Sequence, residues 1–288
     1  MKLYPTFQGN RGHSFIPSRF FRSLAALALV GWLGMPAFSP AATLVVTNLA
    51  SIGPGTLRWA VTNAQNGDVI TFGVTGMITN GSLTISNNIS IVGPGPSLLT
   101  ITGNGSARAF SINNGVTAAI SGLTFTNCYA SWDGGAIYNS GNLSLSNCLF
   151  AGCNSALCCV SGINGGPGFA GGNGGAIYNG GILTAVNCQF LHNATCNGGK
   201  GAGGSVDSSS FWTSGGNGGN GGNGGAVYDA GTASFLNCTF GWNASGSGGA
   251  GGGGASGYWN PYTRQHTGGS GSPGGNGGDA GNGSAVFS

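Results

Sequence analysis

The sequence predicts an all-β fold in which parallel strands coil and stack on one another. A core Gly-Gly-Ala-Ile/Val-Tyr begins at Gly134, Gly174 and Gly224, and each copy has a Cys 14 residues after its first Gly. The copies start 40 and then 50 residues apart, so chain of variable length enters at one place. A constant core with variable insertions is typical of one structural unit stacked on itself.

Residues 1–41 have the pattern of a secretory signal peptide. Four basic residues precede the short apolar run Leu24–Leu33, and Ser39–Ala41 supplies small residues at the cleavage positions. The apolar run is shorter than the roughly 20 residues that cross a bilayer. We therefore expect an exported protein, extracellular or associated with the cell surface or outer membrane, with no membrane span in residues 42–288.

Removal of the leader changes the charge balance. Residues 42–288 carry four basic residues against five Asp, a net charge of −1, and no Glu. There is no basic patch, so binding to nucleic acid has no electrostatic support.

The first elements after the leader predict a strand and a cap. Thr43–Thr47 has strand character, and Thr56–Gln65 places its apolar residues on one helical face. A stack of strands exposes an apolar cross-section at its end, which a short helix can cover. We expect this helix to cap the N-terminal end of the fold.

Short alternating segments continue from Val69, joined by connections rich in Gly, Asn and Pro. The expected strands are Val69–Phe72, Leu83–Ser86, Ile89–Val92, Leu99–Thr102, Ala109–Ile112, Ala119–Ser121 and Leu123–Thr126. Alternation alone also fits an antiparallel sandwich. The identical offsets within the repeat cores favour parallel coiling, because they place like residues above like residues.

The offsets also predict columns of side chains. Four columns are expected to point inward: Ile137, Ile177 and Val227; Leu143, Leu183 and Ala233; Leu145, Ala185 and Phe235; and Phe150, Phe190 and Phe240. Asn147, Asn187 and Asn237 are expected at a corner, with amides that bond along the stack. Tyr138, Tyr178 and Tyr228 are expected on the exterior.

Eight cysteines in an exported chain raise the question of disulfides. Cys148, Cys188 and Cys238 hold one column and are expected to be small buried apolar residues. Cys128 and Cys153 are equivalent positions that could lie close enough to bridge, although parallel columns rarely give the required geometry. Cys158, Cys159 and Cys196 fall in adjacent insertions, where one disulfide between Cys196 and the 158/159 pair could form.

Two sequence patterns resemble a known protein class. Gly-Gly-Ala-Ile followed by Phe-x-x-Asn (Phe190 to Asn193, Phe240 to Asn243) is similar to the polymorphic outer membrane protein repeat. Val46–Arg58 with Asn66–Phe72 resembles the opening of large bacterial surface proteins with right-handed parallel β-helix repeats. The resemblance covers about residues 43 to 245 and implies that fold, in an autotransporter passenger or an anchored adhesin.

The chain departs from that class at its C-terminal end. It has no C-terminal barrel or sorting anchor, and Gly283–Phe287 looks like a fourth repeat core that stops partway. We therefore expect a domain over residues 42–288 that is truncated at its C-terminus; the alternative is a fold that ends in an uncapped edge.

Candidate catalytic and metal sites are weak. Parallel β-helix lyases and hydrolases need grouped carboxylates, whereas the five Asp are scattered. Gly274–Asp279 matches only the first part of a calcium-binding repeat, and the glycine motif Gly216–Gly221 does not open a helix after a strand. We expect no enzymatic activity, cofactor or metal. The alternative is a polysaccharide lyase or hydrolase whose active site lies in missing repeats.

Glycine-rich insertions occupy about residues 154–173, 194–223 and 244–282. All are expected to leave one corner of the fold as a row of loops. Their aromatic residues could contact a ligand or fold back onto the body: Phe211, Trp212, Tyr258, Trp259 and Tyr262. The expected function is a non-enzymatic, adhesin-like scaffold, monomeric, that binds a protein or glycan on a host or neighbouring cell.

Overall fold

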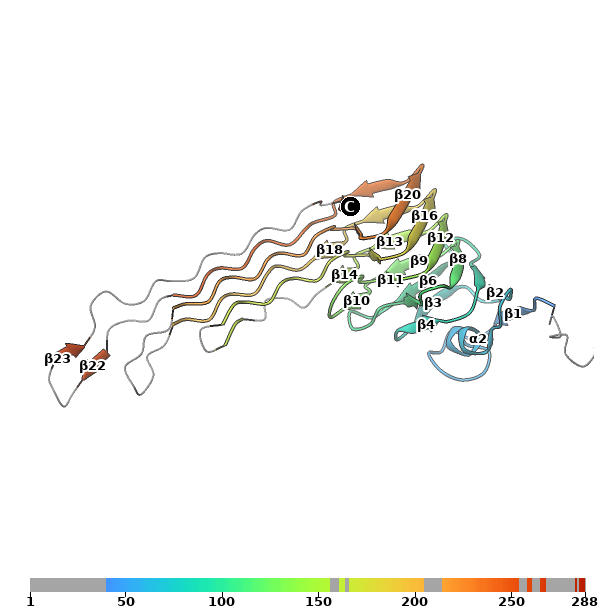
Figure 1. The fold of residues 1–288 in the computed structure, drawn as a ribbon. Coiled ribbons are helices and arrows are strands. Elements are labelled where there is room, and N and C mark those ends of the chain that lie inside the picture. Colours follow the sequence, from blue (N-terminus) through green and yellow to red (C-terminus); the bar gives the residue numbers. More distant parts are fainter. Residues whose placement is uncertain are drawn as a thin grey trace, which may run out of the picture. The chain divides into compact units, whose positions relative to one another are not determined.

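The computed structural model describes residues 40–155, 161–163, 166–204, 214–253, 258–260, 265–267, 283 and 285–287. The chain divides into two units, Met1–Pro40 and Ala41–Ser288. The predicted signal peptide lies outside the described residues except for Pro40 and Ala41. Among its described residues, the second unit is all-β apart from one short helix (Figure 1).

The largest sheet has seven strands, and each strand comes from a later part of the chain than the one before it. In spatial order they are β1 (Thr43–Val46), β2 (Val69–Phe72), β5 (Ile89–Val92), β8 (Thr117–Ser121), β12 (Asn142–Ser146), β16 (Ile182–Val186) and β20 (Thr232–Leu236). All six pairings are parallel. The prediction of parallel strands is therefore confirmed for this sheet.

Two six-stranded sheets and a three-stranded sheet repeat this order. The first contains β4 (Leu83–Ile85), β7 (Phe110–Ile112), β11 (Ile137–Asn139), β15 (Ile177–Asn179), β19 (Val227–Asp229) and β24 (Val286–Phe287). The second contains β3 (Gly76–Thr79), β6 (Leu99–Thr102), β9 (Thr124–Thr126), β13 (Leu149–Ala151), β17 (Gln189–Leu191) and β21 (Thr239–Gly241). The small sheet contains β10 (Tyr129–Ala130), β14 (Asn154–Ser155) and β18 (Ala194–Thr195).

The registers place equivalent residues of the repeat cores side by side. Tyr138 pairs with Tyr178, which pairs with Tyr228. The predicted inward columns are likewise aligned, with their members mostly buried. One constant core therefore recurs at each step along the sheets.

The interior contains a stack of phenylalanine rings. Phe125, Phe150, Phe190 and Phe240 lie face to face, with ring centroids 4.8, 5.0 and 4.8 Å apart. The first three rings are fully buried. Phe235 packs edge-on against Phe240 at 5.3 Å, which fills the space that Ala185 leaves in the neighbouring column. Burial and ring contacts of this kind stabilise the core.

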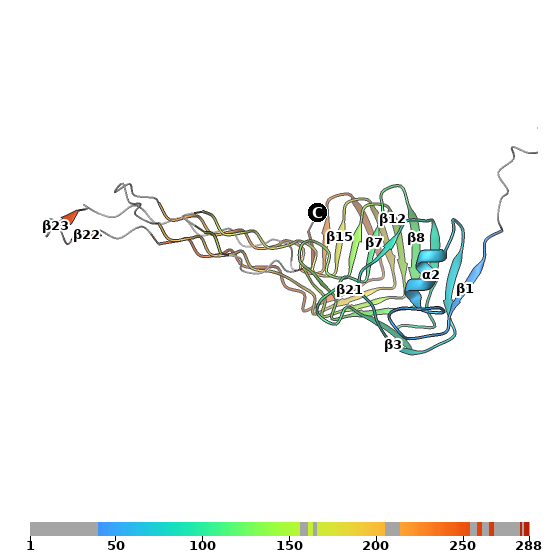
Figure 2. The same cartoon turned by 90° about the horizontal axis from the view of Figure 1, so that it is seen from below.

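The one described helix, α2 (Leu57–Asn63), is shorter than the predicted Thr56–Gln65. Thr56 is its N-cap, and the Thr56 hydroxyl accepts a hydrogen bond from the Trp59 N–H at 3.2 Å. The helix stops because Ala64 is already extended. Its apolar face, including Leu57 and Ala60, is buried, and the helix packs beside β4 (Figure 1) and β1 (Figure 2).

Asp68 holds the chain that follows the helix. Its carboxylate accepts hydrogen bonds from the Ala42 N–H at 2.7 Å and the Gln65 N–H at 2.8 Å. Both bonds favour the charged form and lower the pKa of Asp68 below its usual value of 3.8.

Single residues with positive φ turn three corners of each repeat. Gly134, Gly174, Gly224 and Gly283 form one such column, with φ from 65° to 68°. Gly122, Asn147, Asn187 and Asn237 form the second. Gly and Asn are the residues that adopt this left-handed conformation most readily, which explains their regular placement. The third column contains Asn127, Gly152, His192 and Trp242.

Ladders of side-chain amides run beside these corners. The Asn139 Nδ2 donates to Asn179 Oδ1, and the Asn179 Nδ2 donates to Asp229 Oδ1, both at 2.6 Å. The Asn237 Nδ2 donates to Asn187 Oδ1 at 2.6 Å, which confirms the predicted bond between amides for this pair of the Asn147, Asn187 and Asn237 column. Asn139 and Asn179 are fully buried, so the first ladder satisfies polar groups that have lost contact with water, whereas Asn187 and Asn237 are exposed.

Candidate functional site: a glycine stalk

Four segments of the glycine-rich insertions are hydrogen-bonded to one another. We call segments 166–174, 196–204, 214–223 and 246–253 the glycine stalk. Segments 196–204 and 246–253 lead out from the sheets, and segments 166–174 and 214–223 return to them (Figure 1). None of the four is a β-strand. The sequence analysis predicted a row of loops on one side but not this order.

Antiparallel segments are joined at every third residue. The Gly199 N–H donates to the Phe169 carbonyl at 2.7 Å, and three residues later Ala202 donates to Gly166 at 3.0 Å. The same step of three separates the amides that donate to carbonyls of segment 196–204, which belong to Gly216, Gly219 and Gly222. It also separates the amides that donate to carbonyls of segment 214–223, which belong to Gly246, Gly249 and Gly252.

Parallel segments are joined with the same period. Gly168, Gly171 and Gly174 donate to the carbonyls of Asn217, Asn220 and Asn223 at 2.8–2.9 Å. Gly198, Gly201 and Gly204 donate to Ser247, Ala250 and Gly253 at 2.8–2.9 Å. A polyproline II helix has three residues per turn and no internal hydrogen bonds, so its amides are free to bond to neighbouring chains. The period of three therefore indicates four polyproline-like chains packed side by side.

Close packing explains why glycine is required here. A Cβ at Gly198 would lie 1.7 Å from the Gly219 carbonyl oxygen, and one at Gly246 would lie 1.7 Å from the Cys196 oxygen. Gly168, Gly201 and Gly252 show the same approach, at 1.8–1.9 Å from a neighbouring carbonyl. Any side chain at these positions would push two chains apart, so the glycines act as packing residues rather than as flexible linkers.

Larger residues occur mainly at the third position of each turn, where the chain faces solvent. In Gly215–Asn223 the pattern is Gly-Gly-Asn, and Asn217 and Asn220 are exposed while the intervening glycines are buried. The equivalent exposed positions elsewhere are Pro167, Ala170, Asn197, Lys200, Gly203, Ser247, Ala250 and Gly253. Phe169 departs from the pattern, at 49% exposed.

Polar contacts fix the base of the stalk to the sheets. The Asp133 Oδ1 accepts from the Asn173 N–H at 2.7 Å, and the Asn173 Oδ1 accepts from the Asn223 N–H at 2.9 Å. The buried Thr195 hydroxyl donates to the Gly222 carbonyl at 2.6 Å. Cys196, also at the base, is disulfide-bonded.

The predicted disulfide residues Cys158 and Cys159 lie outside the described residues. Cys128, Cys148, Cys153, Cys188 and Cys238 carry free thiols. Cys128 and Cys153 therefore do not bridge, and the column of Cys148, Cys188 and Cys238 is packed as free thiols, buried except for the half-buried Cys238.

The third insertion contains an antiparallel hairpin, β22 (Tyr258–Asn260) and β23 (Gln265–Thr267). The hairpin holds Tyr258 and Trp259, two of the predicted ligand-contacting aromatics. Phe211, Trp212 and Tyr262 lie outside the described residues, as does the candidate calcium segment Gly274–Asp279.

Other aromatic columns lie on the body of the fold. Tyr138, Tyr178 and Tyr228 stack with centroids 4.9 and 5.3 Å apart, so their ring faces cover one another and only their edges face solvent. His192 and Trp242 stack at 5.0 Å, and Trp242 is 78% exposed. Both hold positive φ, 55° and 53°, which is unusual for bulky residues and costs backbone strain. Sequence reasoning did not identify this pair.

Carboxylates do not gather in the described part of the chain. Asp68 bonds to backbone amides, Asp133 bonds to Asn173, and Asp229 bonds to Asn179. Among the described residues no group of three His, Cys, Asp or Glu could hold a metal ion. Asp207 and Asp279 lie outside these residues.

No known protein family matches the chain, and a search of curated proteins finds no similar sequence. Within the described ranges, no helix combines the length and the apolar character needed to cross a bilayer.

Proposed function

We propose that the chain is an exported, non-enzymatic scaffold that winds as a right-handed parallel β-helix and binds its target through the ends of the glycine-rich insertions, as an adhesin does. The hydrogen-bond period of the glycine stalk carries this proposal. A chain that served only as a linker would not need a glycine at each contact and a bond at every third amide.

The stalk supplies reach and stiffness. At about 3.1 Å per residue, a nine-residue segment such as 196–204 spans roughly 28 Å. Hydrogen bonds to two or three neighbours hold each segment along that length, so the ordering cost of the four stalk segments is met before a target binds. Aromatic residues in the insertions, including Tyr258 and Trp259, are the expected contact residues because aromatic side chains dominate binding energy at interfaces.

Export and adhesion are tested separately. Residues 1–41 fused to alkaline phosphatase should direct the enzyme out of the cytoplasm, and the secreted chain should begin near residue 42. Beads coated with the full chain should adhere to cultured epithelial cells or to bacterial cells.

Replacement of Phe211, Trp212, Tyr258, Trp259 and Tyr262 by Ser should abolish adhesion without changing amide exchange in the stalk. Adhesion that survives these five replacements, or an absence of adhesion to every cell type, would contradict the proposal.

A further inference from the structure

The outer face of the seven-stranded sheet is a second candidate surface, separate from the glycine stalk. Across β5, β8, β12, β16 and β20, alternate side chains point away from the core in three columns. The middle column is Ser90, Ala119, Ser144, Thr184 and Ser234; the flanking columns are Thr117, Asn142, Ile182 and Thr232, and Val92, Ser121, Ser146, Val186 and Leu236.

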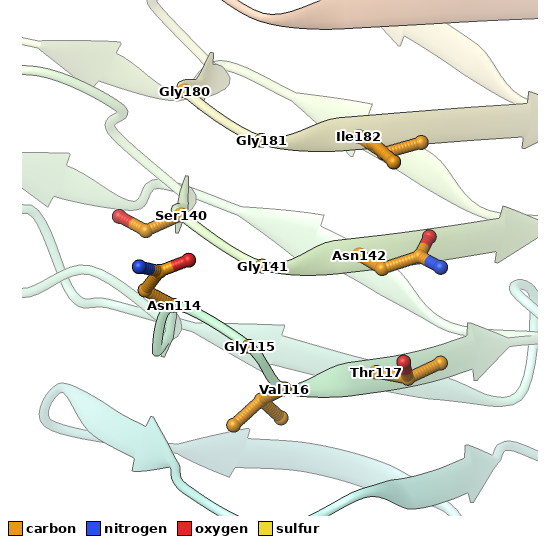
Figure 3. A pocket seen from close by; sticks show the side chains of 10 residues that line it. All are labelled: Asn114, Gly115, Val116, Thr117, Ser140, Gly141, Asn142, Gly180, Gly181 and Ile182. Atoms are coloured by element: carbon orange, nitrogen blue, oxygen red, sulfur yellow. The ribbon is translucent and has the colours of Figure 1, made fainter.

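Two shallow hollows lie on this face, each with a volume of about 310 Å³. The first lies where β8, β12 and β16 begin, and Figure 3 shows Thr117, Asn142 and Ile182 on successive strands along it. The second is lined by the middle and last residues of β5, β8, β12 and β16, including Ser144 and Thr184. Together the hollows cross four neighbouring strands, β5, β8, β12 and β16.

The chemistry of the face is neutral and mixed. None of the five strands contains a charged residue. The hydroxyls of Ser90, Ser144 and Thr184 form no hydrogen bond to any described part of the chain. Large aliphatic side chains are exposed beside them: Val92 at 43%, Ile182 at 52% and Leu236 at 65%.

This combination favours a sugar over a protein partner. Protein interfaces are enriched in aromatic residues, Met and Arg, and the three columns contain none of these. Sugar rings present hydroxyls at their edges and C–H groups on their faces, which match a row of hydroxyls flanked by aliphatic side chains. The missing charge disfavours acidic polysaccharides, whose desolvated carboxylates would find no partner.

We propose that the outer face binds a neutral, extended oligosaccharide that runs along the stacking direction of the strands. Neighbouring strands are about 4.8 Å apart, a distance close to the length that one sugar ring adds to an extended chain. Each ring can therefore meet an equivalent set of side chains on the next strand.

The test uses the full chain and hexasaccharides of cellulose, xylan, mannan and chitin, with hexagalacturonate as the acidic comparison. Binding is measured by isothermal titration calorimetry. The double variant Ser144→Ala/Thr184→Val removes two hydroxyls with little change of shape, and Thr239→Val makes the same change at an exposed position of another sheet.

At least one neutral hexasaccharide should bind, the double variant should weaken that binding at least tenfold, and Thr239→Val should change it less than twofold. Affinity should increase with oligosaccharide length up to about five rings, the number of strands on the face. Absence of binding by every neutral sugar, tighter binding of hexagalacturonate, or equal binding by the double variant would overturn the proposal. The variant with five aromatic residues of the insertions replaced by Ser leaves the outer face unchanged. If that variant no longer binds the sugar, the sugar binds to the insertions, and the proposal is overturned as well.

Discussion

Gly219→Ala should break the glycine stalk locally while leaving the sheets intact. A Cβ at Gly219 would lie 2.0 Å from the oxygen and 2.4 Å from the carbon of the Phe169 carbonyl, whereas ordinary contact begins at 3.4 Å. Segments 166–174 and 214–223 must therefore separate by about 1.4 Å, the difference between the 3.4 Å of ordinary contact and the 2.0 Å to the Phe169 oxygen. The Gly219 N–H donates to Gly199 and its carbonyl accepts from Gly249, both at 2.8 Å, and this shift strains both bonds.

The expected loss follows from three terms. Two hydrogen bonds contribute about 1 kcal/mol each, and forcing a methyl group into close packing costs about 1–3 kcal/mol. Reduced freedom of the unfolded chain offsets about 0.4–1 kcal/mol. The net loss is about 2–4.6 kcal/mol for opening of the stalk, which corresponds to amide exchange roughly 30- to 2,000-fold faster.

Hydrogen–deuterium exchange with mass spectrometry measures this change on peptides from 166–174, 196–204 and 214–223. Gly253→Ala is the matched control, because a Cβ at Gly253 meets no atom within 4 Å. Equal exchange rates in the two variants would refute the argument that close approach dictates glycine. In both variants, peptides from β12 and β16 should still exchange their amide hydrogens more slowly than peptides from the stalk.

The other predictions concern single contacts of the body and base. Trp242→Asn should raise the free energy of unfolding by about 1 kcal/mol, because the central value for relief of backbone strain, in a range of about 1–3 kcal/mol, exceeds that for loss of the ring stack with His192, in a range of about 0.5–1.5 kcal/mol; a lower midpoint in urea would contradict this. Asn179→Leu should destabilise the fold by about 2–4 kcal/mol, seen in the thermal midpoint, since it removes the donor to Asp229 and the acceptor for Asn139. Cys196→Ser removes the disulfide at the base of the stalk and should speed amide exchange in segment 196–204, whereas Cys238→Ser, which changes a free thiol, should not; equal effects would show that the disulfide does not hold the base. Asp68 has a lowered pKa in the folded state, so the stability that it contributes is present above its usual pKa of 3.8 and is lost as the pH falls through the folded value; acid titration followed by circular dichroism should show a smaller loss in Asp68→Asn.

The sheets were accessible to sequence reasoning because their pattern is local and repeated. Identical offsets in three cores predicted the columns of Ile137, Leu143 and Phe150, and the registers confirm them. Strand β3 (Gly76–Thr79) was missed because it has a single buried residue, Ile78, next to a Met77 that is 57% exposed, and one buried position gives no alternation. The two-residue strands β10, β14 and β18 were missed because two residues give no periodicity.

The stalk was harder to predict because the glycines that contact one another belong to different insertions, far apart in the sequence. Gly-Gly-X runs without a break in Gly215–Asn223 and Gly248–Gly253, but segments 166–174 and 196–204 interrupt it at Phe169 and Ala202, so the four segments do not share one obvious period in the sequence. The period becomes visible when segments of 49-residue separation are aligned, as in the bonds from Gly168 to Asn217 and from Gly198 to Ser247. That separation is close to the 50-residue spacing of the second and third cores.

This similar spacing of the insertions and the cores explains how one chain forms both the parallel sheets and the glycine stalk. Parallel stacking of the cores places the base of each insertion beside the next, as the ladder from Asp133 through Asn173 to Asn223 shows. Once the bases are aligned, chains of polyproline type can bond at every third amide without forming a sheet. The sheets therefore set the register of the stalk, and a change that shifts one core relative to its neighbour should disorder the insertions before it unfolds the body.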